Sequence, residues 1–171
     1  MTSRLSHPNT AALFALCLSG GLLVGALVFE HVFGYAPCTM CYWQRHAHKA
    51  VIALALGALV LGHFKPALRK PVLALVILAL GVSAYIAFKH MGVEYGWWEG
   101  PKACASGNLG GFSFDADNPL GALDNPIKPP SCDEAVWHFA GLSMAAWNGI
   151  LSLIGALLVA GLMRYKARHG E

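Results

Sequence analysis

Three long stretches of this chain contain no charged side chain, and they restrict its fold more than any other feature. They cover residues 9–29, 71–88 and 139–163. A helix needs about 20 mostly apolar residues to cross the hydrocarbon core of a bilayer. Of the 171 residues, 12% are charged and 56% are hydrophobic, whereas a typical soluble domain has about 25% charged residues. The sequence therefore predicts a membrane protein with at least three transmembrane helices.

A fourth apolar stretch, residues 50–62, is too short to cross alone. Extending it back to Tyr42 gives about 22 residues, or about 33 Å of helix at 1.5 Å per residue. This extension places Arg45 and Lys49 in the first turns of the helix. The alternative is a re-entrant segment that enters the bilayer only partly. We favour a full crossing, because an even number of crossings fits the distribution of charge.

The basic residues predict the orientation. The connection between the second and third spans and the end of the chain are both basic, whereas the long connection over residues 89–136 has three lysines and seven acidic residues. Cytoplasmic loops are enriched in Lys and Arg, so both termini are expected in the cytoplasm. The net charge of +3 is explained by this orientation and gives no support to nucleic-acid binding. The basic residues in question are Lys65, Arg69 and Lys70, then Arg164, Lys166 and Arg168.

The predicted fold is an all-α membrane protein, a four-transmembrane-helix bundle that forms a single domain over residues 1–171. The first apolar run is too long for a signal peptide, so we expect it to remain as a transmembrane anchor. The two connections that lack a basic excess form the outer loops. The expected spans are about 10–30, 42–63, 71–88 and 139–163, with a long outer loop of about 89–136.

Five cysteines are divided by this topology. Cys17 falls inside the first span, where we expect a small buried apolar residue. Cys38 and Cys41 lie in the first outer connection, and Cys104 and Cys132 lie in the second. The outer side of a bacterial membrane is the oxidising side. All four outer cysteines are therefore candidates for disulfide chemistry.

The Cys38–Cys41 spacing leaves three interpretations open. A redox-active pair is favoured, because Cys-x-x-Cys pairs are typical of redox or metal sites. A copper or zinc site could use Cys38, Cys41 and either His46 or His48, with Met40 suited to Cu(I). A static bridge is least favoured, since so small a loop gains little chain entropy.

The surroundings of Cys41 favour electron transfer to a lipid-soluble acceptor. If a helix begins near Thr39, its amino terminus stabilises a thiolate at Cys41. Arg45 is four residues further on, on the same helix face, and adds a positive charge. An anionic sulfur beside a cation at the membrane boundary suits a quinone. The alternative for Arg45 is an interfacial anchor, and His46, His48 and Lys49 are mostly expected to be such anchors.

The stretch "CTMCYWQR", residues 38–45, resembles the C-x-x-C-x-x-x-R signature of the bacterial disulfide bond formation protein B (DsbB) family. Members of this family are quinone-linked thiol oxidases of the inner membrane. The resemblance extends over nearly the whole chain, including four spans, a second cysteine pair, and "CDEAVWHFAGLSMAAWN" before the last span. The vitamin K epoxide reductase family fits less well, because its Cys-x-x-Cys lies in a late helix.

The resemblance implies a role for each cysteine. Cys38 and Cys41 would form the membrane-proximal disulfide, with Cys41 facing ubiquinone or menaquinone. Cys104 and Cys132 would form a loop disulfide that meets a periplasmic DsbA-like oxidase with a thioredoxin fold. Electrons would pass from that partner through the loop pair to the membrane-proximal pair. The resemblance also implies that Arg45 assists Cys41 and that His90 lies near the quinone ring.

Overall fold

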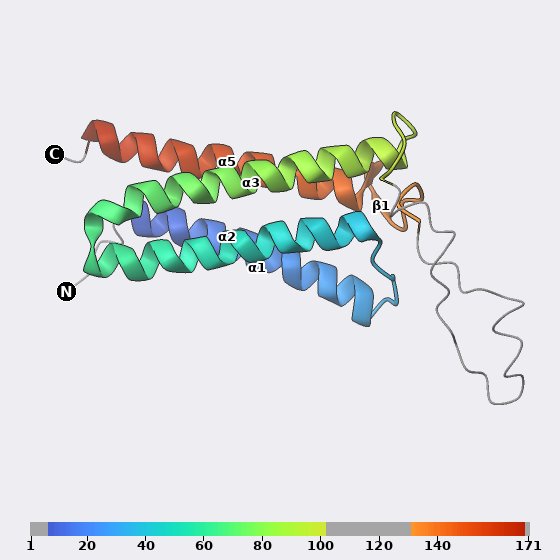
Figure 1. Ribbon diagram of the computed structural model, residues 1–171, viewed down its shortest axis with the longest axis horizontal. Coiled ribbons are helices and arrows are strands. Elements are labelled where there is room, and N and C mark those ends of the chain that lie inside the picture. Colours follow the sequence, from blue (N-terminus) through green and yellow to red (C-terminus); the bar gives the residue numbers. More distant parts are fainter. Residues whose placement is uncertain (1–6, 102–130, 170–171) are drawn as a thin grey trace, which may run out of the picture.

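The computed structural model describes residues 7–101 and 131–169, and its described part is dominated by four long helices (Figure 1). Each of the four is long and apolar enough to cross a membrane. The predicted all-α, four-helix membrane fold is therefore confirmed. The helices are α1 (His7–His31), α2 (Thr39–Phe64), α3 (Pro66–Glu94) and α5 (Met144–His169).

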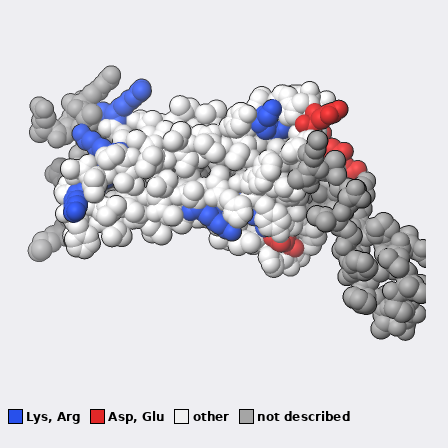
Figure 2. Space-filling view, in the orientation of Figure 1, with Lys and Arg blue, Asp and Glu red and all other residues white. Residues whose placement is uncertain are grey.

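The helices run up and down, so that the two ends of the bundle differ. Helix α1 begins and α5 ends at the same end as the α2–α3 connection, and the α1–α2 connection lies at the other end (Figure 1). Acidic side chains gather at that other end (Figure 2). Inside hydrocarbon every backbone polar group must be bonded within the chain. Helices meet this requirement along their length, so irregular backbone is left for the ends.

The α2–α3 connection is a single residue, Lys65. Its N–H donates to the carbonyl oxygen of Leu61 at 2.6 Å, which closes the end of α2. Pro66 then starts α3, where a proline is tolerated because the first N–H groups of a helix have no partner within it. Helix α3 continues from there to Glu94, beyond both ends of the expected span 71–88.

A short β-hairpin precedes α5. Strands β1 (His138–Phe139) and β2 (Leu142–Ser143) pair antiparallel. The two residues between them, Ala140 and Gly141, have φ values of 52° and 78°, as a type I′ turn requires. An α-helix cannot contain such residues, so the expected span 139–163 begins in the hairpin and its helix starts only at Met144. Ser143 caps that helix by accepting a hydrogen bond from the Ala146 N–H at 3.2 Å.

The bundle core is built from small and aliphatic side chains. In α1 the residues Ala11, Ala15 and Ser19 are all fully buried and recur every four positions, so they form the inner face. Cys17 lies off this face and is exposed, which makes the expectation of a buried Cys17 wrong. Small residues allow helices to approach closely. At Gly149, for example, an added Cβ would lie 3.4 Å from the Cβ of Ala87.

Among the described glycines, Gly92 is the one where an added Cβ would make the closest contact. A Cβ there would lie 2.0 Å from Cζ2 of Trp98, and the indole Nε1 donates to the Lys89 carbonyl oxygen at 2.8 Å. We expect Gly92→Ala to lower the free energy of unfolding by about 1–3 kcal/mol, because the ring must move. Denaturation of the purified protein in detergent measures this. Gly81→Ala is the control in the same helix, since nothing lies within 4 Å of that site; an equal loss in both variants would contradict the packing argument.

Candidate functional site

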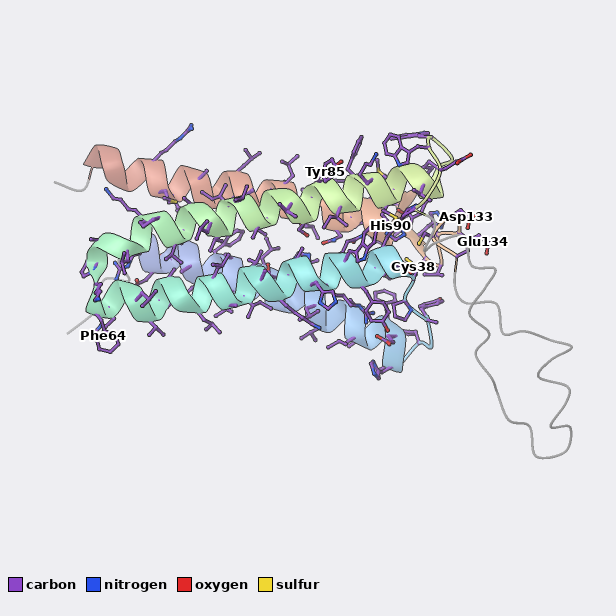
Figure 3. All side chains as sticks on the ribbon, viewed as in Figure 1. Cys38, Phe64, Tyr85, His90, Asp133 and Glu134 are labelled. Atoms are coloured by element: carbon purple, nitrogen blue, oxygen red, sulfur yellow. The ribbon has the colours of Figure 1, made fainter. Side chains whose placement is uncertain are left out.

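The candidate site lies at the end of the bundle that carries the α1–α2 connection. Cys38, His90, Asp133 and Glu134 gather there, at the opposite end from Phe64 (Figure 3). Cys38 and His90 come from sequence positions far apart, and they are 6% and 4% exposed. The fold therefore brings the first outer connection, the end of α3 and the segment before β1 to one place.

Cys38 is the N-cap of α2. Its backbone is extended, with φ −77° and ψ 173°, and its Sγ accepts a hydrogen bond from the Cys41 N–H at 3.2 Å. The cap sets Cys41 in the first turn of the helix, with the two sulfur atoms hydrogen-bonded at 2.9 Å. Both residues are free thiols in this structure. The expected position of Cys41 at a helix amino terminus is thus observed.

Cys132 lies directly beside this pair. The sulfur atoms of Cys38 and Cys132 and a ring nitrogen of His90 all lie within 4.8 Å of one another. Cys132 is 1% exposed and is engaged in a disulfide. Cys104, the expected partner, lies outside the described residues. The free thiol of Cys38 and the disulfide sulfur of Cys132 therefore need to move only a short distance to come into contact.

The same cluster bears on the metal alternative. Three potential ligands meet at Cys38, His90 and Cys132, but a sulfur in a disulfide is not a thiolate ligand. Two donors then remain, fewer than the three or four protein ligands typical of zinc sites. His48, one of the expected ligands, is bonded elsewhere, to Ser19 and Asn148. A metal site is therefore not favoured.

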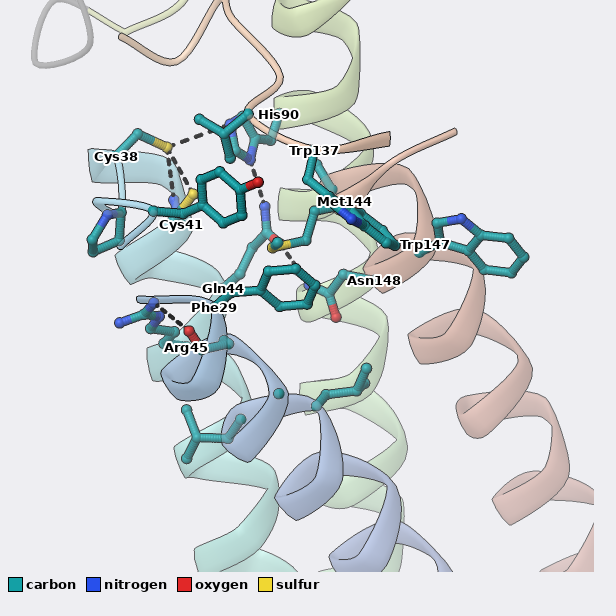
Figure 4. Close-up of a pocket in the computed structure, with 18 of the residues that line it drawn as sticks. Phe29, Cys38, Cys41, Gln44, Arg45, His90, Trp137, Met144, Trp147 and Asn148 are labelled. Atoms are coloured by element: carbon teal, nitrogen blue, oxygen red, sulfur yellow. Dashed lines mark hydrogen bonds between the residues drawn. The ribbon is translucent and has the colours of Figure 1, made fainter. Parts of the chain in front are cut away.

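A cavity of about 370 Å³ opens beside the two cysteines and reaches into the bundle. Cys38, Cys41, Arg45 and His90 all line it, together with Gln44 (Figure 4). Most of the remaining wall is apolar or aromatic. Such a wall with a few placed polar groups is typical of small-molecule sites. Its aromatic and apolar residues include Leu22, Phe29, Tyr35, Trp137, Met144 and Trp147.

Arg45 contributes to this cavity from α2, but its polar partners lie on α1. Its guanidinium donates to the carboxylate of Glu30 and, at 3.1 Å, to the carbonyl oxygen of Ala26. The group also lies 5.5 Å from the ring centroid of Tyr42. The side chain is only 11% exposed, so Arg45 is a paired group at the cavity wall rather than an anchor that reaches to the headgroups.

His48 is the clearest correction to the sequence prediction. An interfacial anchor was expected, yet the residue is 3% exposed in the bundle interior. Met40, Gln44, His48, Val51 and Ala55 are all buried residues of α2, and their spacing is that of one helix face. Gln44 and His48 lie on the same helix face as Val51 and Ala55, and this pattern in the sequence indicates that both polar side chains are buried. Asn148, the partner of both, could not be found in this way because it lies on another helix.

The thiol of Cys38 is more acidic than an ordinary cysteine. The hydrogen bond with Cys41 lowers its pKa, and the His90 ring, whose Nε2 lies 3.4 Å from Cys38 Sγ, lowers it further, against the opposing effect of burial. A lowered pKa favours the thiolate, which is the form that takes part in disulfide exchange. Cys38 thus has the electrostatic environment of a redox cysteine.

Comparisons with known proteins agree with this site. The family model described as "Disulfide bond formation protein DsbB" matches residues 8–162. A disulfide bond formation protein B of Pasteurella multocida is 32% identical over 153 residues, covering 85% of this chain and 80% of that protein. One from Aromatoleum aromaticum is 32% identical over 164 residues, with 89% of each chain covered. Disulfide bond formation protein B 2 of Pseudomonas aeruginosa is 31% identical and covers 87% of this chain and 88% of its own.

The pKa of Cys38 can be tested by alkylation of the reduced protein, resolved by residue with mass spectrometry. A thiol of ordinary pKa, about 8.5, loses its thiolate roughly a hundredfold between pH 8 and pH 6. Because the native pKa of Cys38 is lower, its thiolate persists in this range and is lost only as the pH falls through that lower value. We expect similar rates at pH 8 and pH 6. The same cysteine in denatured protein is the control, and an equally steep loss in the native protein would contradict the assignment.

Proposed function

Because this chain belongs to the DsbB family and is a multi-pass membrane disulfide oxidoreductase, we propose that it reoxidises a periplasmic DsbA-like dithiol and passes the electrons to membrane quinone. The path runs through Cys104–Cys132 and then Cys38–Cys41. The observation that carries this proposal is the position of Cys38. Its sulfur lies within 4.8 Å of the disulfide-bonded Cys132 and faces the same cavity as Cys41.

The first half of the reaction brings electrons to the membrane-proximal pair. A thiolate of the partner attacks Cys104, which forms a mixed disulfide and releases Cys132 as a thiolate. Cys132 then attacks Cys38 of the Cys38–Cys41 disulfide; a Cys38–Cys132 bond forms and Cys41 leaves as a thiolate.

The second half releases the oxidised partner. Its second thiol attacks the mixed disulfide and frees Cys104, which attacks Cys132 and displaces Cys38 as a thiolate. Two electrons have then moved from the partner to Cys38 and Cys41, and the loop disulfide has reformed. The described cysteines are compatible with this stage, since Cys38 and Cys41 are free and Cys132 is in a disulfide.

The cavity is suited to a planar, lipid-soluble oxidant. Its lining is largely apolar and aromatic, and its polar groups include Arg45, His90 and Gln44 close to Cys41. These residues would hold the ring of ubiquinone or menaquinone, with His90 as a contact in addition to Arg45. A quinone bound there would accept the two electrons and two protons of the thiol pair. The chain itself supplies the sulfur of Cys41 at the cavity wall and hydrogen-bond donors beside it.

The orientation that we propose places the redox cysteines at the periplasmic face of the bacterial inner membrane. The single-residue connection at Lys65, next to Arg69 and Lys70, lies at the end where α1 begins and α5 ends (Figure 1). Basic residues favour the cytoplasmic side. Both termini would then be cytoplasmic, and the chain would act as one membrane domain over residues 1–171.

Replacing Cys41 tests the electron path. We expect Cys41→Ser to abolish reduction of added quinone by a reduced DsbA-like partner, because no dithiol remains at the cavity to be oxidised. Loss of quinone absorbance measures the turnover. Cys17→Ser is the matched control, since Cys17 is exposed on the bundle surface away from the site, and it should retain full activity. Wild-type turnover in Cys41→Ser would rule out the path.

Replacing Arg45 tests the cavity. We expect Arg45→Ala to reduce kcat/KM for quinone by about ten- to a hundredfold, the effect of losing hydrogen bonds from a charged group of about 1.5–3 kcal/mol. Steady-state kinetics at varied quinone concentration measure this, while the exchange of electrons between partner and loop disulfide should be unchanged. An unchanged kcat/KM for quinone would remove Arg45 from the quinone site.

A further inference from the structure

A chain of hydrogen-bonded polar side chains runs through the bundle interior and ends at Cys38. We call it the core polar chain, and all four helices contribute to it. Ionisable and polar groups inside a membrane protein are costly unless they are bonded, and they usually mark function. The expected roles of the redox residues do not require the core polar chain. Its members are Ser19 of α1, His48 and Gln44 of α2, Asn148 of α5 and His90 of α3.

All hydrogen bonds of the core polar chain are donated in the same direction, toward Cys38. His48 Nε2 lies 2.7 Å from Oδ1 of Asn148, an oxygen that can only accept, so the ring carries its proton on Nε2. Its Nδ1 then accepts from the hydroxyl of Ser19 at 3.2 Å. Asn148 Nδ2 in turn donates to Oε1 of Gln44 at 2.6 Å. Each donor therefore points toward the next member on the way to Cys38.

The last two bonds determine the state of His90. Gln44 Nε2, which can only donate, lies 2.8 Å from Nδ1 of His90. That nitrogen must be the unprotonated one, so a neutral His90 carries its proton on Nε2. This N–H faces Sγ of Cys38 at 3.4 Å and the carboxylate of Glu94 at 3.7 Å. The opposite direction would leave a lone pair facing Cys38, which cannot stabilise a thiolate.

We propose that Gln44 and Asn148 are positioning residues that fix the tautomer of His90 with its Nε2–H toward the Cys38 sulfur. This inference rests on the proposed function and extends it, because it assigns the redox poise of the Cys38–Cys41 pair to residues that do not touch either sulfur. Figure 4 shows the arrangement, with Gln44 between His90 and Asn148. At the other end of the core polar chain, His48 orients the amide of Asn148 through its hydrogen bond to Oδ1.

The consequence concerns the oxidising strength of the pair. A donor that faces Cys38 stabilises its thiolate, and stabilising the reduced form of a dithiol makes its disulfide a stronger oxidant. Electrons are then drawn from the loop pair toward the membrane-proximal pair.

Few other described groups can act on Cys38. Those in contact with it are Cys41 of α2, His90 of α3, and the disulfide sulfur of Cys132. Of the nearby carboxylates, Glu94 lies against the His90 ring and Glu134 lines the same cavity. From α1, Glu30 is paired with Arg45, and α5 lines the cavity with the amide of Asn148 rather than with a charged group.

Two substitutions along the core polar chain test this role. Gln44→Leu removes the donor to Nδ1, so we expect the midpoint of Cys38 alkylation against pH to rise by about one unit, a tenfold loss of thiolate below the midpoint. Asn148→Leu should behave like Gln44→Leu. The measurement uses the reduced full-length protein without quinone or partner, with the alkylated residue identified by mass spectrometry.

Ser83→Ala is the matched control. The Ser83 hydroxyl is buried and contacts His48 Nε2 at 3.2 Å. Its removal leaves the bonds from His48 to Asn148, from Asn148 to Gln44 and from Gln44 to His90 in place, so the midpoint should not move. The nitrogen chemical shifts of ¹⁵N-labelled histidine provide a second measurement, in which wild-type His90 shows the Nε2–H tautomer and Gln44→Leu does not. Equal midpoints in wild type, Gln44→Leu and Asn148→Leu, or an Nδ1–H tautomer in the wild type, would overturn the inference.

These experiments separate the inference from the proposed function. If the midpoints shift as expected but wild-type protein does not transfer electrons from a reduced partner to quinone, the proposed function fails and the positioning role of Gln44 stands. If turnover is normal but the midpoints do not shift, the proposed function stands and the positioning role fails. If Gln44→Leu does not fold, Asn148→Leu still tests the positioning role.

Discussion

Hydrocarbon offers the backbone no hydrogen-bond partner, so each helix of this protein must satisfy its polar groups within the chain. The difficult points are the helix ends, where the first N–H groups have no partner in their own helix. At the start of α2 the partner is a sulfur atom, since Cys38 Sγ accepts from the Cys41 N–H. The bond that completes the helix also sets two cysteines side by side. Cys38 lies at the N-cap, where the chain enters the helix, and Cys41 lies in the first turn.

The same constraint explains the interior of the bundle. A buried histidine or amide without partners would be strongly unfavourable in a low-dielectric medium. His48, Asn148 and Gln44 are tolerated because each satisfies the next. Since the chain of bonds crosses from α2 to α5 and back, it also fixes how these helices are placed around the cavity. The hydrogen bonds that satisfy these buried polar groups therefore also determine the shape of the cavity.

The sequence predicts some of this well and some of it not at all. The four helices follow from uncharged runs and helix geometry, which are local properties. The closeness of Cys38 and Cys41 follows from their spacing, whereas the contacts of Cys38 with His90 and Cys132 depend on which helices are neighbours. The prediction that His48 lies at the interface is wrong, because this residue shares the buried face of α2 with Val51 and Ala55. The hairpin before α5 was missed because its turn, Ala140–Gly141, lies in an uninterrupted apolar run.

The ion pair of Arg45 changes how the charge near Cys41 should be understood. Glu30 lies on α1 and accepts from the guanidinium directly, so the pair carries little net charge toward the cavity. Coulomb stabilisation of a thiolate by Arg45 alone is therefore reduced. What remains is the directional capacity of a guanidinium, which has more donors than Glu30 and Ala26 use. The thiolate of Cys38 is instead stabilised by its hydrogen bond with Cys41 and by the N–H of His90. Arg45 instead links α2 to α1 through its hydrogen bonds to Glu30 and Ala26. Its remaining N–H groups can donate to a ligand.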